Sequence, residues 1–155
     1  MSSPLMSSLI FSSLVQFFQV IVNDLKIPGH GTSVTEAQLV LSNNAYNWLK
    51  CGTEYVDGRY HASVVVTVNG WSDWSLVPLE KPPSPFRLRV KREREAIHVE
   101  YGEGENGPFK IMRLAYLPLV KKTRTIMVGI MCASPNEESD GFDVIFDQLN
   151  ITKHS

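Results

Sequence analysis

Residues 47–75 read NWLKCGTEYVDGRYHASVVVTVNGWSDWS, in which two turn dipeptides separate runs that alternate between polar and apolar residues. Asp57-Gly58 and Asn69-Gly70 are dipeptides that β-hairpins favour, because both central residues of the preferred two-residue turn have positive φ. The stretch therefore predicts three antiparallel strands joined by tight turns.

The first turn sets the pairing of the first two strands. A two-residue turn at 57–58 places Glu54 opposite His61 and Trp48 opposite Thr67, and strand side chains alternate between the two faces of a sheet. One face is then a mixed polar surface, which we call the polar face: Trp48, Lys50, Glu54, His61, Ser63 and Thr67. The opposite face is apolar and predicts the core: Leu49, Cys51, Tyr55, Tyr60, Ala62, Val64 and Val66.

The second turn allows two registers. A two-residue loop would place Asp73 opposite Val66 on the core face, where a carboxylate would be buried without an obvious partner. We therefore predict a three-residue loop over residues 69–71. A register shift of one residue moves every side chain of the third strand to the other face of the sheet. Asp73 would then join the polar face, Trp74 would point inward, and Trp71 would be an exposed aromatic at the loop tip.

The remaining sequence continues the β pattern. Further alternating or β-branched runs occupy residues 38–41, 86–91, 97–101, 109–116, 125–132 and 142–149. Turn residues separate these runs, and the proline-rich segment 78–85 is a crossover, since proline is excluded from central strands. We expect an all-β, antiparallel two-sheet sandwich over residues 36–155, preceded by a segment 1–35 with one strand at residues 16–22.

Composition narrows the function classes. The chain has 155 residues and a net charge of -1, with 15 basic and 16 acidic residues interspersed. No overall field favours nucleic acid or an anionic membrane, so neither is expected as a partner. Residues 5–22 are too polar for a membrane span and lack the features of a secretory signal. The two cysteines have no metal-ligand spacing, and we expect free thiols in the reducing cytoplasm with no metal or cofactor.

Several motifs together resemble one family. Residues 47–58 read NWLKCGTEYVDG, residues 112–116 MRLAY, residues 129–135 GIMCASP and residues 141–146 GFDVIF. In this order the chain resembles the regulation-of-enolase-protein family, a domain of unknown function in the concanavalin A-like lectin and glucanase superfamily. The resemblance implies a jelly-roll sandwich and a metabolic enzyme such as enolase as a partner. It also implies that residues 1–35 are a divergent or truncated segment, which would leave a sheet edge open for self-association.

Three functions and one structural alternative compete for the polar face. A protein partner or a carbohydrate could bind to Trp48, Lys50, Glu54, His61, Asp73 and Trp71, which supply stacking rings, donors and acceptors. Glycoside hydrolysis is the weakest reading, because we find no carboxylate pair placed across a cleft and expect no catalytic residue. Alternatively, Lys50, Glu54, Asp73 and Arg113 form an ion-pair network that only stabilises the sheet. We predict a non-catalytic binding domain with a protein partner, and a lectin-like module as the alternative.

Overall fold

The computed structural model describes residues 6–12, 17–26, 36–119, 125–133 and 143–153, and these residues form eleven strands and no helix. The strands are β1 (Met6–Ser12), β2 (Phe17–Lys26), β3 (Glu36–Asn44), β4 (Asn47–Val56), β5 (Arg59–Val68), β6 (Trp71–Pro78), β7 (Phe86–Glu93), β8 (Ala96–Glu103), β9 (Lys110–Tyr116), β10 (Thr125–Ala133) and β11 (Ile145–Lys153). Among the described residues, no helix has the length and apolar character needed to cross a membrane.

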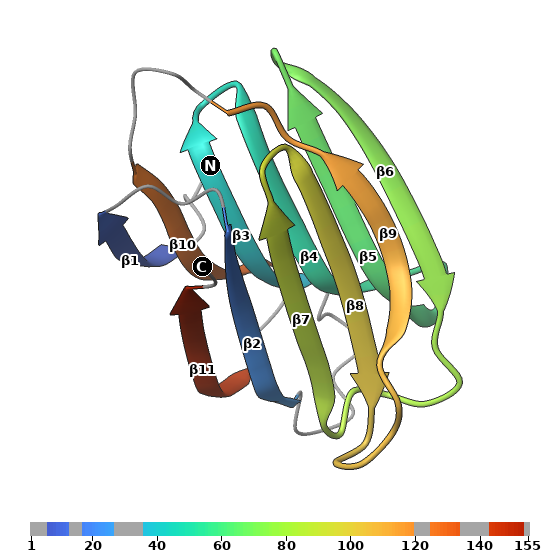
Figure 1. The fold of residues 1–155 in the computed structure, drawn as a ribbon. Helices are drawn as coiled ribbons and strands as arrows, with labels where there is room; N and C mark the ends of the chain where they lie inside the picture. Colours follow the sequence, from blue (N-terminus) through green and yellow to red (C-terminus); the bar gives the residue numbers. More distant parts are fainter. Residues whose placement is uncertain (1–5, 13–16, 27–35, 120–124, 134–142, 154–155) are drawn as a thin grey trace.

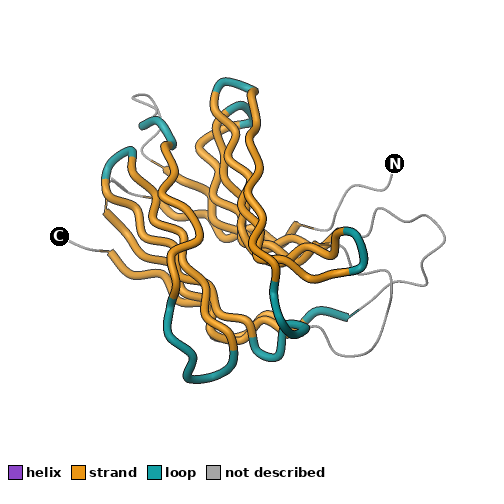
Figure 2. The backbone as a smooth tube through the Cα atoms, turned by 90° about the vertical axis from the view of Figure 1, so that its right-hand side faces the viewer, coloured by secondary structure: helices purple, strands orange, loops and turns teal. Residues whose placement is uncertain are grey.

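The strands build two antiparallel sheets that pack face to face (Figure 1). The six-stranded sheet has the order β1-β10-β3-β4-β5-β6, and the five-stranded sheet has the order β11-β2-β7-β8-β9. In Figure 2 the lower ends of the β4–β5 strands curve away from the five-stranded sheet, so the outer face of the six-stranded sheet is concave. The predicted all-β two-sheet sandwich is confirmed.

The amino-terminal segment contributes one strand to each sheet. β1 pairs with β10 at the edge of the six-stranded sheet, and β2 lies between β11 and β7. The sequence indicated a single strand at residues 16–22, whereas the structure has a longer one, β2, and a second one, β1. Both sheets therefore include strands from outside residues 36–155.

Apolar side chains between the sheets form the core. The predicted inner face of β4 and β5 is confirmed, since Leu49, Cys51 and Val64 have no exposed surface. They face Leu88 and Val99 of the five-stranded sheet within one buried cluster. Burial of each of the leucine and valine side chains contributes about 1.5–3 kcal/mol to stability. Burial also raises the pKa of the Cys51 thiol far above its usual range, so that this thiol stays protonated.

The first predicted register is confirmed and the second is wrong. β4 and β5 pair as expected, with Glu54 opposite His61 and Trp48 opposite Thr67. The β5–β6 turn, however, has two residues, with Asn69 and Gly70 at φ 51° and 82°, and it places Asp73 opposite Val66. This register was expected to bury the Asp73 carboxylate. However, β6 lies at the edge of the sheet, and the Asp73 side chain is 64% exposed.

Candidate functional site

Glu54 lies at the centre of the polar face. It comes from the middle of the concave sheet and is only 7% exposed. Its Oε2 accepts a hydrogen bond from the indole Nε1 of Trp74 at 2.8 Å and a second one from the hydroxyl of Ser63. Ser63 is fully buried, and its Oγ also lies 3.0 Å from the same indole nitrogen. Three strands thus contribute to one compact polar centre.

Glu36 and Lys50 extend this centre toward β3. Glu36 lies directly opposite Glu54 in the sheet, and its Oε2 accepts a hydrogen bond from Nζ of Lys50 at 2.9 Å. The Lys50–Glu36 pair spans Gly52, which has no side chain to block it. A Cβ at Gly52 would lie 2.1 Å from the carbonyl oxygen of Ala37, so the close approach of β3 and β4 requires glycine here. We call Glu36, Lys50, Glu54, Ser63 and Trp74 the carboxyl cluster.

The two carboxyl groups of the cluster lie opposite each other, and their surroundings shift their pKa values in opposite directions. Burial and the hydrogen bond with Glu36 raise the pKa of Glu54, and these effects exceed the opposing hydrogen bonds from Ser63 and Trp74. Burial also acts to raise the pKa of Glu36, but the hydrogen bonds with Glu54 and Lys50 outweigh it and lower that pKa. Glu54 therefore holds a proton more readily than Glu36 does, and Glu36 is the carboxylate that pairs with Lys50.

Trp74 is the aromatic residue that the sequence analysis did not place on this face. The two-residue turn brings it opposite Val65, on the same side of the sheet as Lys50 and Ser63. Its nitrogen is held by Glu54, yet the residue is 53% exposed. The structure therefore presents a fixed, half-exposed indole ring on the concave face. The two-residue turn was rejected because it would bury Asp73. If β6 is treated as an edge strand, this objection disappears, and the two-residue turn places Trp74 on the polar face.

The other predicted residues lie outside the cluster. Trp48 and His61 lie on the polar face, but His61 hydrogen bonds to the carbonyl of Arg59. Asp73 lies on the opposite face, which corrects the prediction, and forms an ion pair with Arg113 of β9. Trp71 is 85% exposed, as predicted, although it is the first residue of β6.

A second feature of the same face is Gln38, which the sequence analysis also missed. Gln38 lies opposite Gly52 and has no exposed surface. Among the residues that the structure describes, neither its side-chain nitrogen nor its side-chain oxygen has a hydrogen-bond partner. A buried amide without partners is uncommon in native proteins, and here it lies two residues from Glu36 on the same strand.

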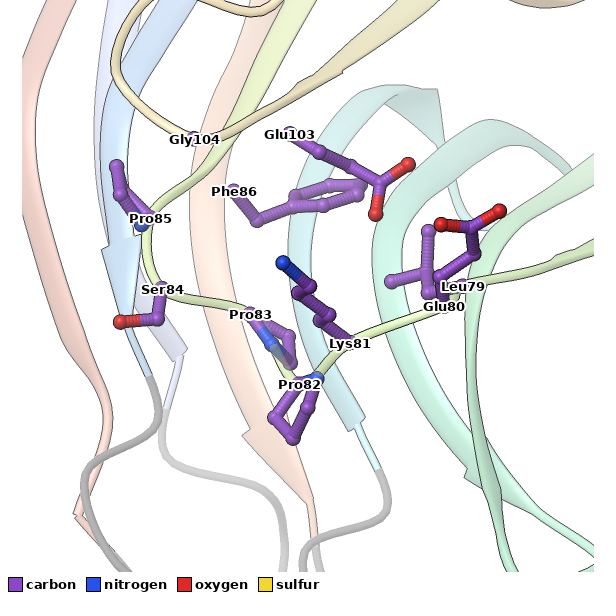
Figure 3. A pocket seen from close by; sticks show the side chains of 10 residues that line it. All are labelled: Leu79, Glu80, Lys81, Pro82, Pro83, Ser84, Pro85, Phe86, Glu103 and Gly104. Carbon is purple, nitrogen blue, oxygen red and sulfur yellow. The ribbon is translucent and has the colours of Figure 1, made fainter.

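A separate cavity of about 600 Å³ lies along the proline-rich crossover between β6 and β7 (Figure 3). Figure 3 shows the Lys81 side chain extending toward Phe86. Glu80 and Glu103 also line the cavity, while the Phe86 ring itself is 1% exposed and unavailable for stacking. No predicted site residue lines this cavity. In the described part of the chain, no group of three or more His, Cys, Asp or Glu residues could hold a metal ion.

Comparisons with known proteins agree with the fold. Residues 32–154 match a family described as "Protein of unknown function (DUF1349)". This description does not mention enolase, so the resemblance to the regulation-of-enolase family is not confirmed. No curated protein matches the chain.

Solved structures share the sandwich. A functionally unknown protein from Saccharomyces cerevisiae is 25% identical with a TM-score of 0.79, over 96% of this chain and 74% of that one. The GH43 protein BlXynB from Bacillus licheniformis is 16% identical with a TM-score of 0.71, over 90% of this chain but only 28% of that one. The exoplasmic/lumenal domain of VIP36, in its Ca²⁺/Man2-bound form, is 14% identical with a TM-score of 0.62, over 99% and 73%. The lectin-like jelly-roll sandwich is thereby confirmed.

Proposed function

Because this chain belongs to the family described as "Protein of unknown function (DUF1349)", whose description assigns no activity, we propose a function from the site: a non-catalytic carbohydrate-binding domain. The ligand is a sugar that stacks on Trp74 at the concave face of the six-stranded sheet. The half-exposed indole ring, anchored at its nitrogen by Glu54, carries this proposal.

An anchored indole suits sugar binding for a physical reason. A ring that is already fixed loses little conformational entropy when a ligand stacks on it. The apolar face of a sugar covers the ring, while hydroxyl groups reach hydrogen-bonding groups beside it. Lys50 and Glu36 retain 16% and 22% of their side-chain exposure, and Ser72 of β6 is exposed. The lectin-like fold, shared with a Man2-bound protein, supports the same class of ligand.

The geometry of the carboxyl pair supports a non-catalytic role. Glycosidases place their two carboxyl groups about 5–9.5 Å apart, so that a glycosidic bond or a water fits between them. Glu36 and Glu54 instead lie opposite each other on adjacent strands, where Glu36 pairs with Lys50 and Glu54 accepts hydrogen bonds from Ser63 and Trp74. Because neighbouring side chains occupy both carboxyl groups, we assign this pair to structure and binding.

Two tryptophan variants test the proposal. Trp74→Ala should abolish binding in a screen of mono- and oligosaccharides followed by calorimetry. Trp71→Ala is the matched control, since it removes an even more exposed ring from the adjacent hairpin tip and should leave affinity unchanged. Equal losses in both variants, or no binding by the unmodified protein, would contradict the proposal.

Protein binding is the second candidate, and the edge strand β9 favours it. Ile111, Leu114 and Tyr116 are 62%, 60% and 60% exposed on this edge. Exposed apolar residues on an edge strand are suited to pairing with another chain. The partner would be a second copy or a metabolic enzyme such as enolase, within the cytoplasm, where the free thiols of Cys51 and Cys132 stay reduced. Leu114→Lys should then abolish self-association in sedimentation or capture of purified enolase, while sugar binding stays unchanged.

A further inference from the structure

We propose that Gln38 is a ligand-binding residue of a second sugar subsite on the concave face, which the Lys50–Glu36 ion pair covers in the present structure. The ligand is then a neutral oligosaccharide of two or more units. Its first unit stacks on Trp74, and its second unit binds to the side-chain amide of Gln38. This inference rests on the proposed function and deepens it by naming the class of sugar.

Gln38 carries a buried amide on the concave face. The residue lies opposite Gly52, on the same face of β3 as Glu36, and it has no exposed surface. Within the described part of the chain, neither polar atom of its side chain has a hydrogen-bond partner. An amide that is buried without partners destabilises the state that buries it. A ligand that offers this amide both a donor and an acceptor would therefore gain from uncovering it.

The Lys50–Glu36 ion pair crosses over this amide. On β4, Lys50 lies two residues before Gly52, and on the antiparallel strand β3, Glu36 lies two residues before Gln38. The 2.9 Å contact between Nζ and Oε2 therefore runs diagonally over the Gln38–Gly52 position. Both ends of the ion pair are partly exposed. Each head group can thus turn to water or to a sugar hydroxyl when the pair opens, whereas the amide beneath it meets no solvent while the pair is closed.

The covered amide lies in line with the stacking ring. The indole nitrogen of Trp74 is 3.0 Å from Oγ of Ser63. Ser63 pairs with Gly52 of the next strand, and Gly52 pairs with Gln38. The line from the indole to the amide therefore crosses two strand spacings, about 10 Å, which is farther than a single sugar ring on Trp74 extends. A second, linked ring would lie over Gly52, which has no side chain to obstruct it.

The amide also selects the chemistry of the second unit. A glutamine side chain accepts hydrogen bonds at its oxygen and donates them from its nitrogen, which suits two neighbouring hydroxyl groups of a sugar. Beside it lie the carboxyl groups of Glu36 and Glu54 with one cation, Lys50. An acidic sugar would meet more carboxyl groups than cations here. The second unit is therefore a neutral sugar with two free neighbouring hydroxyl groups.

Calorimetry with matched pairs of sugars tests this inference, using glucose with cellobiose, mannose with mannobiose and xylose with xylobiose. In at least one pair the disaccharide should bind about tenfold tighter than its monosaccharide, as expected for two added hydrogen bonds. Gln38→Leu should abolish this difference and leave the affinity for the monosaccharide unchanged. The variant should fold, because an apolar side chain of similar size suits a buried position. Trp74→Ala should abolish binding of both sugars.

Thr53→Val is the matched control. Oγ1 of Thr53 is also buried without a partner among the described residues, but Thr53 lies opposite Ala37 and Ala62 on the core face. Its replacement should leave the affinities for both sugars unchanged. NMR of the unmodified protein gives a second measurement that needs no variant. The side-chain amide signals of Gln38 should shift when the disaccharide is added and stay in place when the monosaccharide is added.

Glu36→Gln weakens the ion pair that covers the amide, so the disaccharide should bind several-fold tighter to this variant. Unchanged or weaker binding would overturn the covering role of the pair. Equal affinities for monosaccharide and disaccharide, or a Gln38→Leu variant that keeps the difference, would overturn the subsite and leave stacking on Trp74 intact. No binding of any of these sugars would retire the proposed function itself and the subsite with it.

Discussion

On the outer face of the five-stranded sheet Glu100 accepts a hydrogen bond from Arg89, whereas on the concave face Glu54 lies opposite a second carboxyl group, Glu36. The Arg89–Glu100 pair measures 2.5 Å and its side chains are 33% and 25% exposed. Hydrogen bonding to Arg89 lowers the pKa of Glu100, so that this glutamate stays charged. Burial and a like-charged neighbour do the reverse to Glu54. The same residue type on a strand face therefore has a lowered pKa in an ion pair on one sheet and a raised pKa on the other.

The largest effect should come from filling the side-chain-free position within the carboxyl cluster. Gly52→Val places a Cβ 2.1 Å from the Ala37 carbonyl oxygen and 2.8 Å from the Cα of Gln38. Because both atoms belong to the backbone, β3 and β4 must separate, and we expect a loss of about 3 kcal/mol in unfolding free energy. Urea denaturation measures this loss. As a control, Gly58→Ala has a φ of 77° but no neighbour within 4 Å, and should cost only about 1–2 kcal/mol.

Replacing one glutamate on each face by alanine should lower the unfolding free energy by unequal amounts. Glu54→Ala leaves the buried Ser63 hydroxyl without its acceptor and removes one of the two acceptors of the Trp74 nitrogen, at a cost of about 1–3 kcal/mol. Glu100→Ala breaks a partly exposed ion pair that water screens, and should cost no more than about 1 kcal/mol. Thermal unfolding of both variants at one pH compares them directly. Equal losses would show that the cluster is not a buried network.

The contributions of Glu54 and Glu100 to the unfolding free energy should change with pH in opposite directions. The folded state raises the pKa of Glu54, so it binds more protons than the unfolded state, and this contribution to stability falls as pH rises from 4.5 through the raised pKa. The folded state lowers the pKa of Glu100, so its contribution is present above pH 4.5 and is lost as pH falls below that value.

Unfolding midpoints measured across this range separate the two contributions. Glu54→Gln should flatten the decline at higher pH, and Glu100→Gln should flatten the decline at lower pH. An unchanged high-pH decline in Glu54→Gln would place the responsible proton elsewhere.

The smallest effect should come from the ion pair at the edge between the two faces. Asp73→Asn removes the charge that pairs with Arg113, but the Asp73 side chain is 64% exposed. We expect a change within about 0.5 kcal/mol, because solvent and salt screen such a pair. Arg113 keeps its 2.7 Å hydrogen bond to Ser75 in this variant. A loss similar to that of Glu54→Ala would show that the edge pair is as important as the cluster.

Local rules predicted the strands and the first hairpin because these depend on neighbours in sequence. The Asp57-Gly58 turn and the alternation of side chains are enough to place Lys50 and Glu54 on one face and Cys51 on the other. The same rules failed at the second hairpin. There the correct register was expected to bury the Asp73 carboxylate, but burial depends on whether β6 has a neighbouring strand on its other side, and β6 is an edge strand.

By itself, the sequence determined the sandwich class, the core face of β4 and β5, and the polar character of the opposite face. Only the tertiary structure decided which residues form the carboxyl cluster, because Glu36 and Trp74 reach Glu54 through pairing across β3, β5 and β6. The ion pair between Asp73 and Arg113 also depends on the tertiary structure, because the two residues belong to different sheets. Strand alternation is a property of the local backbone, whereas burial and carboxyl proximity, which shift pKa values, arise only when distant strands meet.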